Sequence, residues 1–120
     1  MINSRIERLI EEVEAAAALD RAMLARAADV LHRAFPHATL PLAASSDLVE
    51  QVLRLVHGLL PAWSIRLTGE ATGPDGHWHC SLRENRDSDE DEVIGLGSGA
   101  TVGLALVAAL LRVALARAAR

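Results

Sequence analysis

The sequence predicts an α+β fold in which a small antiparallel sheet packs against helices. Apolar residues recur every three or four positions in the first half of the chain, alternate with polar residues around two tryptophans, and form a long apolar stretch near the C-terminus. The chain has 120 residues, of which 51% are hydrophobic and 23% charged. This length and composition predict a single globular domain over residues 1–120, with an N-terminal helical segment at 1–35 and a layered α/β core at 40–120.

Two helices are predicted before residue 36, at about 5–17 and 21–34. Ser4 and Glu7 have the spacing of a capping box at the start of the first helix. Asp20 suits the N-cap of the second helix, although the alanine-rich stretch before it leaves open one continuous helix. Pro36 ends the segment, because the helical conformation is disfavoured for the residue before a proline. The predicted inward residues are Ile2, Ile6, Leu9, Ile10 and Val13 in the first helix and Met23, Leu24, Ala27, Leu31 and Phe35 in the second.

A third helix is predicted at about 47–57. Asp47 precedes Glu50 by three residues, which is a capping signal. Gly58 is typical of the residue that ends a helix in a left-handed conformation. The expected inward residues of this helix are Leu48, Val52, Leu55 and Val56.

An antiparallel hairpin is predicted from strands at about 62–69 and 76–84. Apolar and polar residues alternate in both stretches, which are joined by the turn-forming sequence Pro-Asp-Gly. Trp63 and Trp78 lie on the apolar face of this hairpin. Because an isolated hairpin is barely stable, helices must cover that face, mainly the third and the last. A short third strand near 93–94 is possible.

The last helix is predicted at about 100–118 and is the most hydrophobic element, so we expect it at the centre of the core. Gly97 and Gly99 precede it, and Gly103 lies in its first turn. They resemble a dinucleotide-binding turn only superficially, because no strand follows the helix. We expect a flexible entry to the helix and close packing of Gly103 against a neighbouring element.

Composition excludes several kinds of chemistry. All 12 basic residues are arginine, so that there is no lysine for a Schiff base or a phosphate-binding loop. The net charge of −4 and the presence of only three aromatic residues, too few for base stacking, disfavour nucleic-acid binding. The single cysteine, Cys80, fits a reducing compartment, and the N-terminal residues contain no signal-peptide apolar region. We therefore expect a cytoplasmic protein with no membrane span, since glycines interrupt the uncharged stretch at 93–111.

The one candidate metal site is a pair of histidines. His77 and His79 are two residues apart on a predicted strand, so both imidazoles point to the same face, as two zinc ligands would. A third ligand would come from Asp87, Asp89 or Glu90, or from another chain. Cys80 points the opposite way and is expected to be a buried structural thiol. The alternative interpretation of the pair is a solvated polar face of the sheet.

Short segments along most of the chain are similar to those of one known family. RIERLIEEVEAA and DRAMLARAADVL are similar to its N-terminal helices, with Asp20 and Arg21 matching its Asp-Arg pair, although its Gly-Pro break is missing. PLAASSD, AWSIRLT and ATVGLALVAALL resemble later segments, with Leu42, Val102 and Val107 in place of an aromatic residue, a proline and a cysteine. The family is the phage ABA-sandwich domain, found in small proteins of phages, prophages and proteobacteria. The resemblance implies a helix–sheet–helix layering and carries no activity or functional residues.

These observations predict a non-enzymatic protein that acts through protein–protein contact, as a homo-oligomer or with another protein, and without a cofactor. The apolar stripe of the first helix suits an interface as well as a core. Two alternatives remain. One is a metal-binding protein or small metal-dependent enzyme that uses His77 and His79. The other is a nucleic-acid-binding accessory protein that uses Arg112, Arg117 and Arg120 of the last helix.

Overall fold

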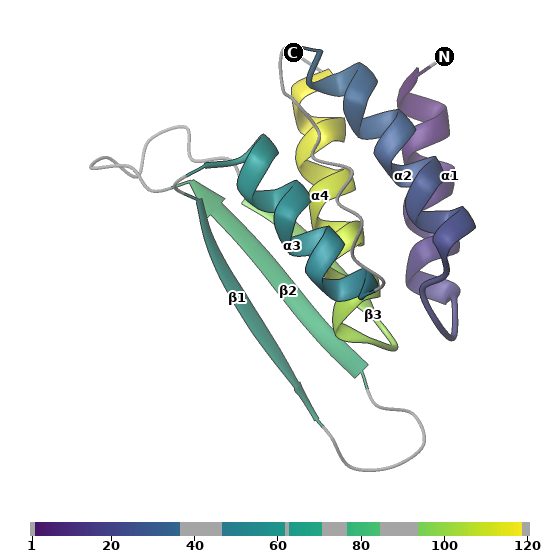
Figure 1. The fold of residues 1–120 in the computed structure, drawn as a ribbon, viewed down its shortest axis with the longest axis vertical. Helices are drawn as coiled ribbons and strands as arrows, with labels where there is room; N and C mark the ends of the chain where they lie inside the picture. The colour runs from purple at the N-terminus through teal and green to yellow at the C-terminus, as the bar shows by residue number, and fades with distance from the viewer. Residues whose placement is uncertain (1, 37–46, 62, 71–76, 85–93, 119–120) are drawn as a thin grey trace.

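In the part of the chain that the structure describes, four helices and a three-stranded antiparallel sheet make up the fold, which confirms the predicted α+β class (Figure 1). The computed structural model describes residues 2–36, 47–61, 63–70, 77–84 and 94–118. The predicted hairpin turn and the acidic segment at 87–92 lie outside these residues. In chain order the elements are α1 (Ile2–Ala15), α2 (Arg21–Ala34), α3 (Leu48–Leu59), β1 (Trp63–Glu70), β2 (His77–Glu84), β3 (Ile94–Gly99) and α4 (Val102–Ala118).

The sheet has the strand order β1-β2-β3, with both pairs antiparallel. Leu67 pairs with Cys80 and Cys80 with Gly97, so that one face carries Trp63, Trp78 and the buried side chains of β2. The hairpin and the shared face of the two tryptophans are therefore confirmed. Both tryptophan side chains are half-buried and pack against the core.

The glycine-rich segment before α4 is a strand, and the prediction of a flexible helix entry was wrong. Gly95, Gly97 and Gly99 lie on the inner face of β3, where α4 packs directly on the strand. A Cβ atom at Gly97 would overlap the backbone nitrogen of Ala109 and lie 2.5 Å from the carbonyl oxygen of Ala105. Glycine is used here because it lets a helix backbone approach a strand backbone closely.

Helix α4 is the centre of a single hydrophobic core, as predicted. Its residues from Leu104 to Leu111 are buried on all sides, and it contacts the other three helices as well as β2 and β3. The core includes residues from α1 and α2, so the N-terminal helical segment shares it with the layered part of the chain. Gly103 packs closely as expected, because a Cβ atom there would lie 3.0 Å from the Leu19 side chain.

Helices α1 and α2 are separate, and the predicted Asp20 cap is confirmed. The Asp20 carboxylate accepts a hydrogen bond from the Met23 N–H at 2.8 Å. The predicted cap at Ser4 was wrong, because α1 begins at Ile2 and Ser4 lies within its first turns. Serine has only a small penalty inside a helix, so a capping signal does not by itself set the boundary.

Helix α3 begins as predicted and ends later. The Asp47 carboxylate accepts hydrogen bonds from the N–H groups of Val49 and Glu50. Gly58 does not end the helix, which continues to Leu59. A glycine inside a helix costs about 1 kcal/mol, and burial of Leu59 and Leu60 offsets that cost.

The helices cover β2 and β3 but leave β1 exposed, which corrects the expectation that they cover the whole hairpin. Helix α4 packs over both inner strands, and α1 adds a smaller contact along β3. Helix α3 packs mainly on α4. In Figure 1, β1 forms the side of the molecule farthest from α1 and α2. No helix within the described ranges is long and apolar enough to cross a membrane.

Candidate interface at the open edge of the sheet

The two edges of the sheet differ in what covers their backbone. At the free edge of β3, the Ser98 N–H donates to a Glu14 carboxylate oxygen at 3.0 Å, and the Leu96 carbonyl accepts from the Arg112 guanidinium at 2.7 Å. Helices α1 and α4 thus supply side chains that satisfy this edge. Covered edges cannot pair with a further strand.

Among the described residues, no strand or side chain pairs with the free edge of β1. In an antiparallel ladder the N–H and C=O of one residue point the same way, and the direction alternates along the strand. Since Leu96 and Ser98 point away from β2, the register places the even-numbered residues of β1 toward β2 and the odd-numbered ones outward. The backbone groups of Ile65, Leu67 and Gly69 therefore point to the open edge.

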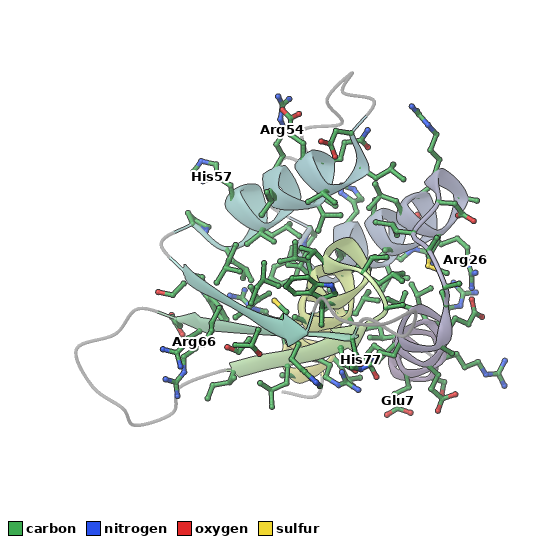
Figure 2. The ribbon with its side chains drawn as sticks, turned by 90° about the horizontal axis from the view of Figure 1, so that it is seen from below. Glu7, Arg26, Arg54, His57, Arg66 and His77 are labelled. Carbon is green, nitrogen blue, oxygen red and sulfur yellow. The ribbon has the colours of Figure 1, made fainter. Side chains whose placement is uncertain are left out.

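The same edge is apolar on its inner face. Ile65 and Leu67 pair with Leu82 and Cys80 and share their face, but they are 39% and 37% exposed whereas their partners are buried. Leu67 has polar neighbours on the opposite face, Arg66 and Thr68. Arg66 and His77 lie on the side of the sheet turned away from Arg54 and His57 of α3 (Figure 2). We call Ile65, Leu67 and Gly69 the open-edge residues.

Sequence reasoning placed these residues on a covered apolar face and so missed the edge. The alternation at 63–68 is the same whether a strand is central or at an edge. The strand order, and the fact that α4 packs over β3 and β2, become visible only in the tertiary structure. The sequence pattern of β1 therefore contains no signal that separates an edge strand from a covered one.

The paired histidines lie where the sequence placed them. His77 and His79 are exposed on the outer face of β2, with their ring centroids 5.1 Å apart and the rings inclined at 68°. Among the residues that the structure describes, no group of three histidine, cysteine or acidic side chains could hold a metal ion. The acidic residues at 87–90 lie outside that part of the chain, so the metal site stays a prediction.

Cys80 lies on the opposite face and is buried, as expected. Burial raises the pKa of its thiol to about 11, because desolvation disfavours the thiolate. A thiol in this state is a poor nucleophile at neutral pH.

The basic residues of α4 are engaged within the fold. Arg112 donates to both carboxylate oxygens of Glu14, at 2.5 and 2.8 Å. The Arg117 guanidinium lies over the Phe35 ring, 4.7 Å from its centroid. Arg120 lies outside the described residues. Arg112 is thus committed to contacts within the fold, and the nucleic-acid alternative stays a prediction.

As far as the structure describes the chain, the fold is a small α+β fold in which one edge of the sheet is exposed. No protein-family model matches the chain, and neither a curated protein nor a solved structure is significantly similar to it. The resemblance to the phage ABA-sandwich domain remains a prediction from the sequence. A function for this chain is therefore inferred from its own geometry.

Proposed function

We propose that this protein is a non-enzymatic interaction protein that forms a homodimer through β1, by antiparallel pairing with β1 of a second copy. The observation that carries the proposal is that Ile65 and Leu67 expose both their backbone groups and their side chains. Their backbone groups point to the open edge, and their apolar side chains lie on the inner face of the sheet but stay exposed, because among the described residues the helices pack over β2 and β3 rather than over β1. Pairing of two such edges satisfies the backbone and buries the side chains together.

A second copy suits this edge because the edge is self-complementary. Two-fold symmetry presents the same residues from both partners, so each open N–H meets an open C=O when the strands run antiparallel. The two three-stranded sheets then form one six-stranded sheet. The apolar side chains of both copies lie on the face that already carries the helices.

The charges on β1 select among the possible registers. A two-fold axis at Arg66 would place this residue directly opposite Arg66 of the partner subunit, and like charges in that position are destabilising. An axis at Leu67 places it opposite Leu67 of the partner subunit and pairs Ile65 with the partner's Gly69. We therefore favour a register centred on an open-edge residue.

Sedimentation velocity at micromolar concentrations tests the proposal. We expect the wild type to sediment as a dimer. Leu67→Lys places a charge on the inner face and should give a monomer. Leu67→Pro removes an N–H that points to the open edge, so it should also prevent dimerisation while keeping the bonds to β2. Thr68→Lys adds the same charge to the other face of the same strand and should leave the dimer intact.

Circular dichroism and urea unfolding of each variant separate loss of the interface from loss of the fold. A wild-type monomer throughout the concentration range would contradict the proposal. So would a folded Leu67→Lys variant that dimerises as well as the Thr68→Lys control.

A further inference from the structure

A groove with a volume of about 340 Å³ runs between α1 and α2 and is separate from the sheet. Arg26, which lines it, projects from the side of the molecule away from the sheet (Figure 2). Three arginines, two acidic residues and two apolar residues line the groove: Arg5, Arg8, Arg26, Glu12, Asp29, Leu9 and Val30. Its volume is within the range of small-molecule sites.

Both acidic residues of the groove are already paired. The Glu12 carboxylate accepts a hydrogen bond from the Arg26 guanidinium at 2.6 Å. This pairing lowers the pKa of Glu12 and raises that of Arg26. Asp29 lies 3.6 Å from the guanidinium of Arg33, which is outside the groove. The negative charges are thus compensated by arginines.

The remaining two arginines carry uncompensated charge. Arg5 and Arg8 are three residues apart on α1, so they lie on neighbouring positions of one helix face. Within the described part of the chain neither has an acidic partner. The lining of the groove, three arginines against two carboxylates, therefore has an excess of one positive charge, although the whole chain has a net charge of −4. Because Arg33 pairs with Asp29 from outside the groove, both Arg5 and Arg8 are left for a ligand.

Apolar side chains lie beside these charges. Leu9 is 3% exposed and Val30 is half-buried, and both line the groove. A ligand that fits has an anionic group for the two guanidinium groups and a small apolar part for this surface. Guanidinium groups bind carboxylate and phosphate oxygens in a planar, two-pronged geometry.

We propose that the groove between α1 and α2 is a binding site for a small oxyanion, a phosphate or carboxylate attached to a compact apolar group, held by Arg5 and Arg8. This site is independent of the proposed dimer, because it lies on other elements. Nucleic acid is disfavoured as the ligand, since the positive charge is confined to a groove of small-molecule size.

Titration of the ¹⁵N-labelled full chain at low salt tests this site, with phenyl phosphate, benzoate and benzyl alcohol as probes. We expect saturable shifts of the amide signals in α1 and α2 with the two anions and none with the neutral alcohol. The anion that binds more tightly identifies phosphate or carboxylate as the preferred group. Arg5→Gln and Arg8→Gln should each weaken binding about tenfold, which corresponds to the loss of one charged hydrogen bond.

Two further variants separate a specific site from general charge. Arg21→Gln makes the same charge change on α2 outside the groove and should leave the affinity unchanged. Asp29→Asn removes a negative charge from the groove and should strengthen binding. The proposal is overturned if neither anion gives saturable shifts, if benzyl alcohol binds equally well, or if Arg21→Gln weakens binding as much as Arg8→Gln.

Discussion

Glu14 and Arg112, from the first and last helices, form a two-pronged ion pair beside β3, with N–O distances of 2.5 and 2.8 Å. Glu14 also accepts hydrogen bonds from the N–H and the hydroxyl of Ser98. One carboxylate thus ties α1 to α4 and covers the edge of the sheet at the same time. It is this contact that makes the two sheet edges different.

Glu14→Gln should destabilise the fold. The amide keeps the size of the side chain but loses the charge that pairs with Arg112, and it replaces one of the two acceptor oxygens by an NH₂ group that cannot accept, so we expect the free energy of unfolding to fall by about 1–2 kcal/mol. Urea unfolding measures this change. Glu12→Gln, at an exposed pair with Arg26, is the matched control and should have little effect. Equal effects of the two substitutions would contradict a special role for Glu14.

The contribution of Glu14 should depend on pH. The ion pair with Arg112 lowers the pKa of Glu14 below its ordinary value of 4.5. A carboxyl group whose pKa is lower in the folded state stabilises the fold above the unfolded-state pKa, and this stabilisation is lost as the pH falls through the folded-state pKa. The stability difference between wild type and Glu14→Gln should therefore be constant from neutral pH to 4.5 and shrink below it. Urea unfolding across this range checks the trend, and an undiminished difference in strong acid would refute it.

Gly97→Ala should be strongly destabilising. The added methyl group would overlap the backbone of Ala109 and force α4 away from β3. Overpacking against a rigid backbone costs about 3 kcal/mol. Leu96→Ala changes the neighbouring residue, which is 59% exposed, and should have only a small effect. Thermal unfolding of the Gly97→Ala and Leu96→Ala variants measures the difference. Similar melting temperatures would show that α4 and β3 can move apart to accommodate the methyl group at little cost.

Cys80 should be unreactive in the native protein. Its thiol is buried and its pKa is raised to about 11, so at pH 8 both access and thiolate formation are restricted. We expect Ellman's reagent to modify the native protein far more slowly than the urea-unfolded chain. Native and unfolded chains that react equally fast would mean that Cys80 is accessible in solution.

Local sequence signals were sufficient to predict the four helices and the first two strands. Asp20 and Asp47 cap their helices by side-chain hydrogen bonds to backbone groups two or three residues away, and such contacts depend on nearby residues alone. The alternation around Trp63 and Trp78 likewise determined which residues share a face, because side chains in a strand point alternately to its two sides.

Contacts between distant segments decided the rest. Gly97 and Gly99, which were predicted to form a flexible entry to the last helix, lie instead in a strand. A strand face without side chains is favourable here only because α4 packs directly against it. The partner of Glu12 is Arg26 on another helix rather than Arg8 one turn away. Which edge of the sheet stays open depends on where α1 and α4 lie. Sequence by itself determined the four helices, the first two strands and their inward faces, since these follow from short-range periodicity. Only the tertiary structure decided the open edge and the charged groove, because each is formed by groups that the chain brings together from separate elements.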